Sequence, residues 1–298
     1  MDPFSQRAQE MGLDVTNAFK GMYSYQDSFG QVVYRQMMTG SVANQQDQDH
    51  PTDGIDLPYL AVFVRAQDET DFSYSGYVSN MYKFVGNEAL TSPIKESILG
   101  TGTPIVRENS LFYDGFARLR HEIIIQSSVT APSVGDVLPV MIISNSYNGT
   151  RAATLSFGLA TMSNSVNYVT FAFKLGEMRM VHIESSSTTM TSAVNEYVET
   201  FRNHIADMIQ QSLGKQLTEE EMLATLDLVE GIGKRRREII SESLPSTVTA
   251  WGMFLAIVKY SSFEANLNVK RMLENIAESV LVIPARMYEV LNRLQESD

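Results

Sequence analysis

Apolar and polar residues alternate through the middle of the chain, and this alternation predicts β-strands. Residues 59–66, YLAVFVRA, are β-branched and aromatic enough for a buried strand. Residues 71–78 place Phe72, Tyr74 and Val78 on one side of a second strand. Further strand-like runs follow a short predicted helix at 87–99, and they cover 116–125, 136–144, 152–160, 167–175 and 178–184, with turns at Asn148-Gly149 and Gly176.

The period of the apolar residues changes to that of a helix after Ser187. Val194, Val198 and Phe201 fall on one helical face. Thr218 and Glu221 have the spacing of a capping box, which predicts a new helix start. Further helical runs cover 233–243, 247–262 and 265–294, punctuated by Pro245 and Pro284.

Strands first and helices afterwards are typical of the α+β class. We therefore expect a largely antiparallel β-sheet core followed by a helical C-terminal section. The polar stretch from residue 41 to 54 predicts a loop, so residues 1–58 are expected to form an N-terminal arm and linker. Residues 59–186 would form the β-rich core, and residues 187–298 would pack on it as one compact domain.

Composition narrows the class of protein. The chain has 298 residues, 44% of them hydrophobic, which is enough for a sizeable core. The absence of cysteine excludes disulfides, thiolate zinc sites and a cysteine nucleophile. No apolar run approaches the roughly 18 residues of a membrane helix, and the N-terminus lacks the pattern of a signal peptide. These features favour a cytoplasmic protein of a bacterium or a phage-infected cell, without membrane partners.

Charge limits the kind of nucleic-acid contact. The formal net charge of −12 argues against a broad surface that coats duplex DNA, because such a surface is normally basic. A local basic groove remains compatible with this charge.

Catalytic motifs are not found in the sequence. The four histidines have no metal-ligand spacing, and there is no GxSxG elbow or phosphate loop. His182 and Glu184 could share a strand face, whereas His121 and Glu122 could not. We therefore expect neither an enzyme nor a cofactor. One alternative is an enzyme acting on nucleic acid with a metal held by carboxylates such as Asp114, Glu122 and Asp136.

Two stretches resemble the phage/plasmid-like protein family, a domain of unknown function found on phages and conjugative elements. The first is 135–160, in which a strand ends in Ser144-Asn145-Ser146 and passes through a glycine turn into a second strand. The second is 244–262, with Thr249 and Trp251 in matching places. The family's Cys-Ser-Asn-Gly-like turn is replaced by TMSNSVN at 161–167. The resemblance implies a mobile-element context but no settled activity. From the residues alone, Ser-Asn-Ser predicts turn hydrogen bonds, with a phosphate-contacting loop as the alternative.

The segment 223–242 resembles a helix-hairpin-helix motif. Gly231 and Gly233 would join two helices and expose backbone N–H groups to a phosphate, with basic residues on the next turn. These basic residues are Lys234, Arg235, Arg236 and Arg237, and Arg237 stands where the motif carries a small residue. The alternative is an ordinary helical hairpin whose basic residues pair with the acids of the first helix.

A second basic set lies on the predicted sheet. Arg118 and Arg120 are two apart and share one strand face, and Arg151 begins a nearby strand. With Tyr74 and Tyr77 as stacking rings, such a face could follow a single strand. The alternative is that the aromatic residues belong to the core and that the arginines lie on the surface without binding a ligand.

The combined interpretation is a phage- or plasmid-type nucleic-acid-binding protein, with single-stranded DNA favoured. It would act in replication, recombination or annealing, or transcription. The alternative is an acidic protein–protein regulator or assembly factor without direct DNA contact. An apolar stripe around Val269 and Leu273 fits either core packing or a homo-oligomer.

Overall fold

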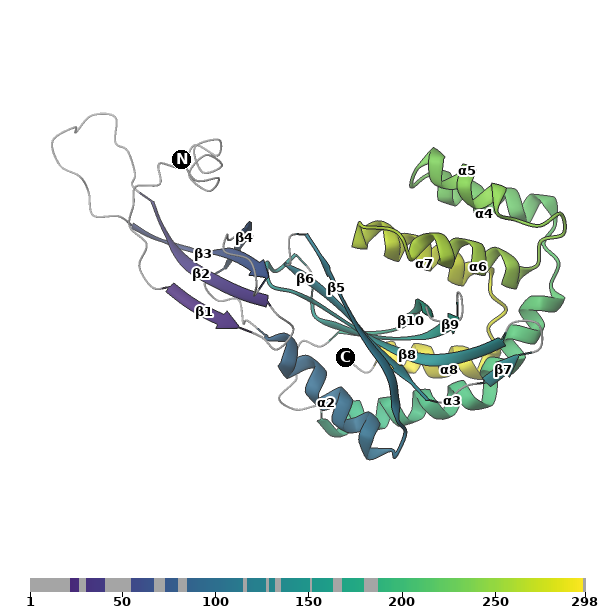
Figure 1. Cartoon of the computed structure of the whole chain (residues 1–298), viewed down its shortest axis with the longest axis horizontal. Coiled ribbons are helices and arrows are strands. Elements are labelled where there is room, and N and C mark those ends of the chain that lie inside the picture. The colour runs from purple at the N-terminus through teal and green to yellow at the C-terminus, as the bar shows by residue number, and fades with distance from the viewer. Residues whose placement is uncertain are drawn as a thin grey trace. The chain divides into compact units, whose positions relative to one another are not determined.

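The protein has an α+β fold, as the sequence predicts (Figure 1). The computed structural model describes residues 22–26, 31–40, 55–66, 73–79, 85–114, 117–126, 129–131, 135–150, 152–162, 168–179 and 187–296. None of the helices in these residues is long and apolar enough to cross a membrane.

The chain forms two compact units, and four of the five boundaries between them fall inside α2 (Asn87–Gly100), β5 (Ile105–Tyr113), β6 (Arg118–Ile125) and β8 (Gly135–Ser146). The first unit contains residues 1–89, 112–119 and 145–152, and the second contains residues 90–111, 120–144 and 153–298. This division differs from the predicted one at residues 58 and 186. The physical reason is that β5, β6 and β8 each contribute residues to both units.

The first unit is built on a four-stranded sheet with the order β1-β2-β3-β4. Its neighbouring strands are antiparallel, as in the pair Val33 and Val64 of β2 and β3. Val33, Leu60, Val62, Val64, Val78, Ala117 and Tyr147 form its core. The strands are β1 (Met22–Gln26), β2 (Gln31–Gly40), β3 (Ile55–Ala66) and β4 (Ser73–Ser79).

A second sheet has the order β10-β9-β8-β6-β5, with the short β7 pairing with β8. Its apolar core includes Ile124, Val140 and Ile142, with Tyr168 packed against it. Its strands are β5 (Ile105–Tyr113), β6 (Arg118–Ile125), β7 (Val129–Ala131), β8 (Gly135–Ser146), β9 (Thr154–Met162) and β10 (Tyr168–Arg179).

One sequence prediction is wrong in this sheet, and one strand was not predicted. The predicted turn at Gly176 is wrong, because β10 continues through it with a register shift between Ala172 and Glu177. The bulge lets one strand follow β9 where the sequence suggested two. In addition, β5 had no prediction, although it forms one end of the strand order.

Helices make up the rest of the second unit. Helix α2 (Asn87–Gly100) precedes the second sheet, and α3 (Ser187–Gly214) follows it. Helices α6 (Ala250–Ser261), α7 (Leu267–Val280) and α8 (Ala285–Glu296) pack on β10. Helices α4 (Glu219–Glu230) and α5 (Lys234–Glu242) contact α6 and α7 on the side away from the sheet (Figure 1).

Candidate functional site

The segment that resembles a helix-hairpin-helix motif forms two packed helices, α4 and α5. Helix α4 begins with the predicted capping box, because the Thr218 hydroxyl accepts from the Glu221 amide while the Glu221 carboxylate accepts from the Thr218 amide. Leu226 and Val229 are buried on the inner face of α4. The connection consists of Gly231, Ile232 and Gly233.

The predicted anion-binding nest at this turn is wrong in detail. The amide of Gly231 donates to the Asp227 carbonyl, and those of Ile232 and Gly233 donate to the Val229 carbonyl. These three N–H groups are therefore used within the hairpin. The amides of Lys234 and Arg235 have no acceptor among the described residues, as expected for the first residues of a helix. They leave two open donors at the N-terminus of α5, where the helix dipole favours an anion.

The four basic side chains divide into two pairs. The Arg236 guanidinium donates to Glu264 Oε2 through Nε and Nη2 at 3.0 and 2.9 Å, and to the Ile232 carbonyl at 3.2 Å. Arg237 Nε lies 3.1 Å from Glu230 Oε2, within ion-pair distance but without hydrogen-bond geometry. Lys234 and Arg235 are exposed and have no ion-pair partner in the described part of the chain. The alternative, in which the basic residues pair with acids of the first helix, therefore holds for Arg237 alone among the four, because Arg236 pairs with Glu264 beyond α6.

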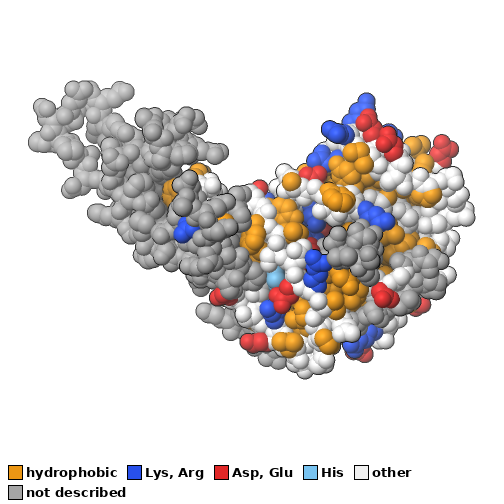
Figure 2. Space-filling view, in the orientation of Figure 1, with side chains coloured by type: hydrophobic (Ala, Val, Ile, Leu, Met, Phe, Trp, Pro, Cys, Tyr) orange, Lys and Arg blue, Asp and Glu red, His pale blue; other side chains and the backbone are white. Residues whose placement is uncertain are grey.

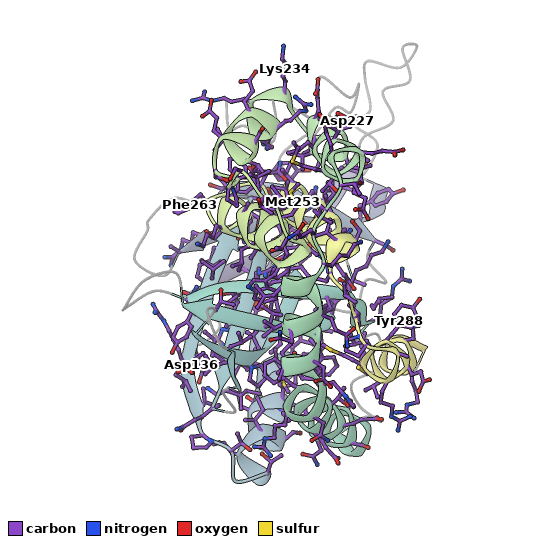
Figure 3. All side chains as sticks on the ribbon, turned by 90° about the vertical axis from the view of Figure 1, so that its right-hand side faces the viewer. Asp136, Asp227, Lys234, Met253, Phe263 and Tyr288 are labelled. Atoms are coloured by element: carbon purple, nitrogen blue, oxygen red, sulfur yellow. The ribbon has the colours of Figure 1, made fainter. Side chains whose placement is uncertain are left out.

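An exposed aromatic residue lies in a turn that an ion pair joins to this hairpin. Phe263, in the turn between α6 and α7, has 87% of its surface exposed. The turn is held by hydrogen bonds from the Phe263 amide to the Tyr260 carbonyl and from the Asn266 amide to Glu264. Because Glu264 also binds Arg236, the turn is tied to the first turn of α5. Figure 3 shows Lys234 at the outer end of α5, Phe263 on the outside of its turn and Met253 inside. The local sequence pattern did not predict the exposure of Phe263.

The predicted exposed face is wrong for Arg120. Its side chain is 1% exposed and is surrounded by Glu122 and Glu274. Arg118 is only partly buried, and it binds Asp114 at 2.9 Å and the Thr150 hydroxyl at 3.0–3.1 Å. The face fails because α7 brings Glu274 onto it, which a local strand pattern cannot show. Arg151 lies outside the described residues.

The predicted tyrosines belong to the first unit. Tyr77 is 49% exposed and makes an edge-to-face contact with the exposed Tyr59, with ring centroids 5.5 Å apart. Tyr74 is partly buried and makes a similar contact with Phe63 at 5.7 Å. Of these four rings, those of Tyr59 and Tyr77 therefore offer substantial surface to a ligand.

A cluster of four buried charges joins β6 to α7. Arg120 donates to Glu122 at 2.8 Å and to both carboxylate oxygens of Glu274 at 2.7 and 3.1 Å. Burial alone would raise the pKa of Glu122, but Arg120, Lys270 and a hydrogen bond from Thr170 lower it below its usual value. Burial, together with the charge of Arg120, lowers the pKa of Lys270 to about 8. The cluster is neutral in sum and closed to solvent, which fits a structural role.

The carboxylates considered for a metal do not come together as a ligand group. Glu122 is engaged by Arg120, and Asp114 binds Arg118. The described residues contain no group of three or more His, Asp or Glu side chains that could hold a metal ion.

His121 belongs to a hydrogen-bonded cluster that no local sequence pattern predicted. Its Nδ1 lies 2.9 Å from the Ser110 hydroxyl, and its Nε2 lies 3.2 Å from Glu108 Oε2. Glu108 in turn accepts from Lys95 at 3.0 Å. Burial lowers the pKa of His121, although Glu108 raises it in part. The imidazole is therefore neutral at pH 7. The other pair considered, His182 and Glu184, lies outside the described residues.

The Ser-Asn-Ser stretch makes turn hydrogen bonds. The Asn145 amide donates to Asn87 Oδ1 at 2.8 Å, and Ser146 Oγ donates to Asn148 Oδ1 at 2.6 Å. The Asn148 amide group donates to the Ser75 carbonyl at 3.0 Å. Gly149 supplies the positive φ of 68° that the turn requires. These side chains stabilise the first unit, and their polar atoms are engaged within it.

The resemblance to the phage/plasmid-like protein family stays a prediction. Comparisons with models of known protein families, with curated proteins and with solved structures gave no match.

Proposed function

We propose that this chain binds nucleic acid, with single-stranded DNA preferred, through the outer surface of α5 and the turn between α6 and α7. The proposal rests on one observation. Lys234 and Arg235 are exposed, lack ion-pair partners among the described residues, and begin a helix whose first two amides are open. Backbone donors, a helix N-terminus and two cations together favour a phosphate group.

The preference for a single strand is supported by Phe263. Unpaired bases can stack on an exposed aromatic ring, whereas the bases of a duplex are stacked on one another. The ion pair between Arg236 and Glu264 ties the turn that carries Phe263 to α5. Lys259, exposed near the end of α6, adds a further cation four residues before Phe263. Figure 2 shows Lys and Arg side chains at the outer end of α5, with acidic side chains beside them.

Acidic neighbours keep the proposed contact local. Glu238 and Glu242 are exposed on α5, and Glu219 and Glu220 are exposed on α4. Such a surface would bind a few phosphates rather than coat a duplex, in keeping with the net charge of −12. The mobile-element resemblance extends the proposal to replication, recombination or annealing of phage or plasmid DNA in the cytoplasm.

The experiment is fluorescence anisotropy with labelled single-stranded and duplex DNA over a salt series. The variant Lys234→Ala/Arg235→Ala is compared with Lys215→Ala/Arg286→Ala, which also removes two exposed cations. We expect the wild type and the control to bind single strands with an affinity that falls with salt, and the hairpin variant to lose binding. Equal losses in both variants would show that only net charge matters, and a wild type that binds no DNA at low salt would refute the proposal.

A second candidate function follows from a different surface of the same hairpin. Leu223 and Leu228 of α4 are 41% and 57% exposed, and carboxylates of the same helix, Asp227 and Glu230, flank Leu228. Exposed apolar residues rimmed by acids favour a protein partner, as in an acidic regulator or assembly factor. A Leu228→Lys variant that loses a captured partner while it keeps DNA binding would support this function instead.

A further inference from the structure

Four side chains of the second unit form a continuous chain of polar contacts that ends at a serine hydroxyl. Lys95 of α2 binds Glu108 of β5, Glu108 binds Nε2 of His121 on β6, and Nδ1 of His121 faces Ser110 of β5. Glu108 and Ser110 are two residues apart on one strand, so they lie on the same side of the sheet. No motif in the sequence brings these residues together, because they come from three elements.

The polarity of the hydrogen bonds is set by chemistry. A carboxylate can only accept, so Nε2 of His121 carries the proton and donates to Glu108. Nδ1 is then unprotonated and accepts from the Ser110 hydroxyl at 2.9 Å. A nucleophile within hydrogen-bond reach of a base, which is oriented by a third group, is the arrangement of an activated serine.

We infer that Ser110 is a nucleophile for acyl transfer, with His121 as its general base and Glu108 as the residue that orients the imidazole. His121 is 2% exposed, so bulk water does not compete for its Nδ1, whereas Ser110 is only partly buried. Strand β5 ends the strand order of its sheet, so one side of the strand has no neighbouring strand among the residues that the structure describes. The substrate class is a small or extended ester that approaches along this side.

The reaction is balanced without a metal or a redox partner. Ser110 Oγ forms a bond to the carbonyl carbon while His121 Nδ1 takes the hydroxyl proton. The carbon–oxygen bond of the ester then breaks, and the imidazolium returns the proton to the leaving alkoxide. Water attacks the acyl-serine in the second half, gives its proton to His121, and the proton returns to Ser110. The ion pair with Lys95 holds the Glu108 carboxylate in place beside Nε2 of His121.

The test treats the full chain with a fluorophosphonate, which forms a phosphorus–oxygen bond to an activated serine and releases fluoride. Intact mass and peptide mapping then locate the adduct. The variants are Ser110→Ala, Glu108→Gln and, as a matched control, Ser279→Ala, whose exposed hydroxyl donates to the Ile276 carbonyl. Thermal unfolding of each variant shows whether it is folded.

We expect an adduct on Ser110 in the wild type and in Ser279→Ala, and none at that position in Ser110→Ala. Glu108→Gln should react about tenfold to a hundredfold more slowly, because the imidazole loses its orienting carboxylate. The same order should hold for the release of p-nitrophenol from p-nitrophenyl acetate. A wild type without an adduct on Ser110, or a folded Glu108→Gln that reacts at the wild-type rate, would overturn the inference.

Discussion

Arg120 and Glu274 are 154 residues apart in the chain, yet their side chains form a two-bonded ion pair inside the second unit. The pair joins β6 to α7, and Glu122 holds the remaining Nε of Arg120. Since every donor nitrogen of the guanidinium has a carboxylate partner, the arrangement satisfies the buried charge fully. The C-terminal helices are thereby fixed to the sheet by a specific contact as well as by apolar packing.

Replacing Arg120 with methionine should strongly destabilise the protein. The change leaves the carboxylates of Glu122 and Glu274 buried without their main partner, and breaking such a pair costs about 3–5 kcal/mol. Urea unfolding measures the loss. The control is Arg118→Met on the same strand, because its partner Asp114 is 51% exposed and the pair should contribute less than about 1 kcal/mol. Equal losses in the two variants would contradict the role given to the buried cluster.

The two arginines also show how far the sequence could predict the fold. The strand-like run at 116–125 correctly predicted β6, and the two-residue spacing of Arg118 and Arg120 led to the expectation of one exposed basic face. Their different exposure depends on Glu274, which comes from α7. Local periodicity contains no information about which other elements cover a strand face. The predicted exposure of Arg120 was therefore wrong.

The candidate sites also differ in whether their signals are local in the sequence or come from distant elements. The hairpin was predictable because its signals, two glycines and a capping box, lie within one short segment. The cluster at His121 was not, because it needs β5, and residues 105–113 lack the apolar alternation that would predict a strand. The exposure of Phe263 was equally hidden, since its sequence context matches the end of an ordinary apolar helix.

Replacing Phe263 with alanine should weaken binding to a single strand and leave binding to a duplex unchanged. Loss of one stacked base costs about 1–3 kcal/mol, or about five- to 150-fold in affinity. Competition anisotropy measures both forms. Phe263→Trp should retain binding, and Tyr288→Ala, which removes another exposed ring on α8, should have no effect. If Phe263→Ala binds single strands as the wild type does, the hairpin acts through phosphate contacts alone.

Replacing Gly233 with alanine should disturb the link between α5 and the turn that follows α6. An added Cβ would lie 2.7 Å from Nη1 of Arg236, while the φ of 161° is extended and strains no residue. The guanidinium would have to move away from the Ile232 carbonyl and from Glu264. We expect a loss of about 1 kcal/mol in urea unfolding and weaker DNA binding.

Gly214→Ala is the matched control for this substitution, because nothing lies within 4 Å of its added Cβ. It should leave both stability and binding unchanged. If Gly233→Ala behaves in the same way, the position of Arg236 is not coupled to binding.

The stability of the protein should fall in mild acid because of His121. In the unfolded chain a histidine has a pKa of about 6.5, whereas burial lowers the pKa of His121 in the folded protein. Lys95 also lowers this pKa, while Glu108 and Glu122 raise it in part. Between the two pKa values the unfolded state binds the extra proton. The contribution of the neutral His121 to the free energy of unfolding is therefore complete above pH 6.5, and it is lost as the pH falls through the folded pKa.

The measurement compares the free energy of unfolding of the wild type and of His121→Gln between pH 8 and pH 5. The variant should be less stable at pH 8, because it loses its hydrogen bonds to Ser110 and Glu108. The difference between the two proteins should shrink in acid, by at most about 1.4 kcal/mol per pH unit. Labelling of wild-type Ser110 should slow only as the pH falls through the lowered pKa of the folded His121, because a protonated imidazole cannot accept the hydroxyl proton. A stability difference that stays constant from pH 8 to pH 5 would show that His121 keeps its ordinary pKa in the folded protein.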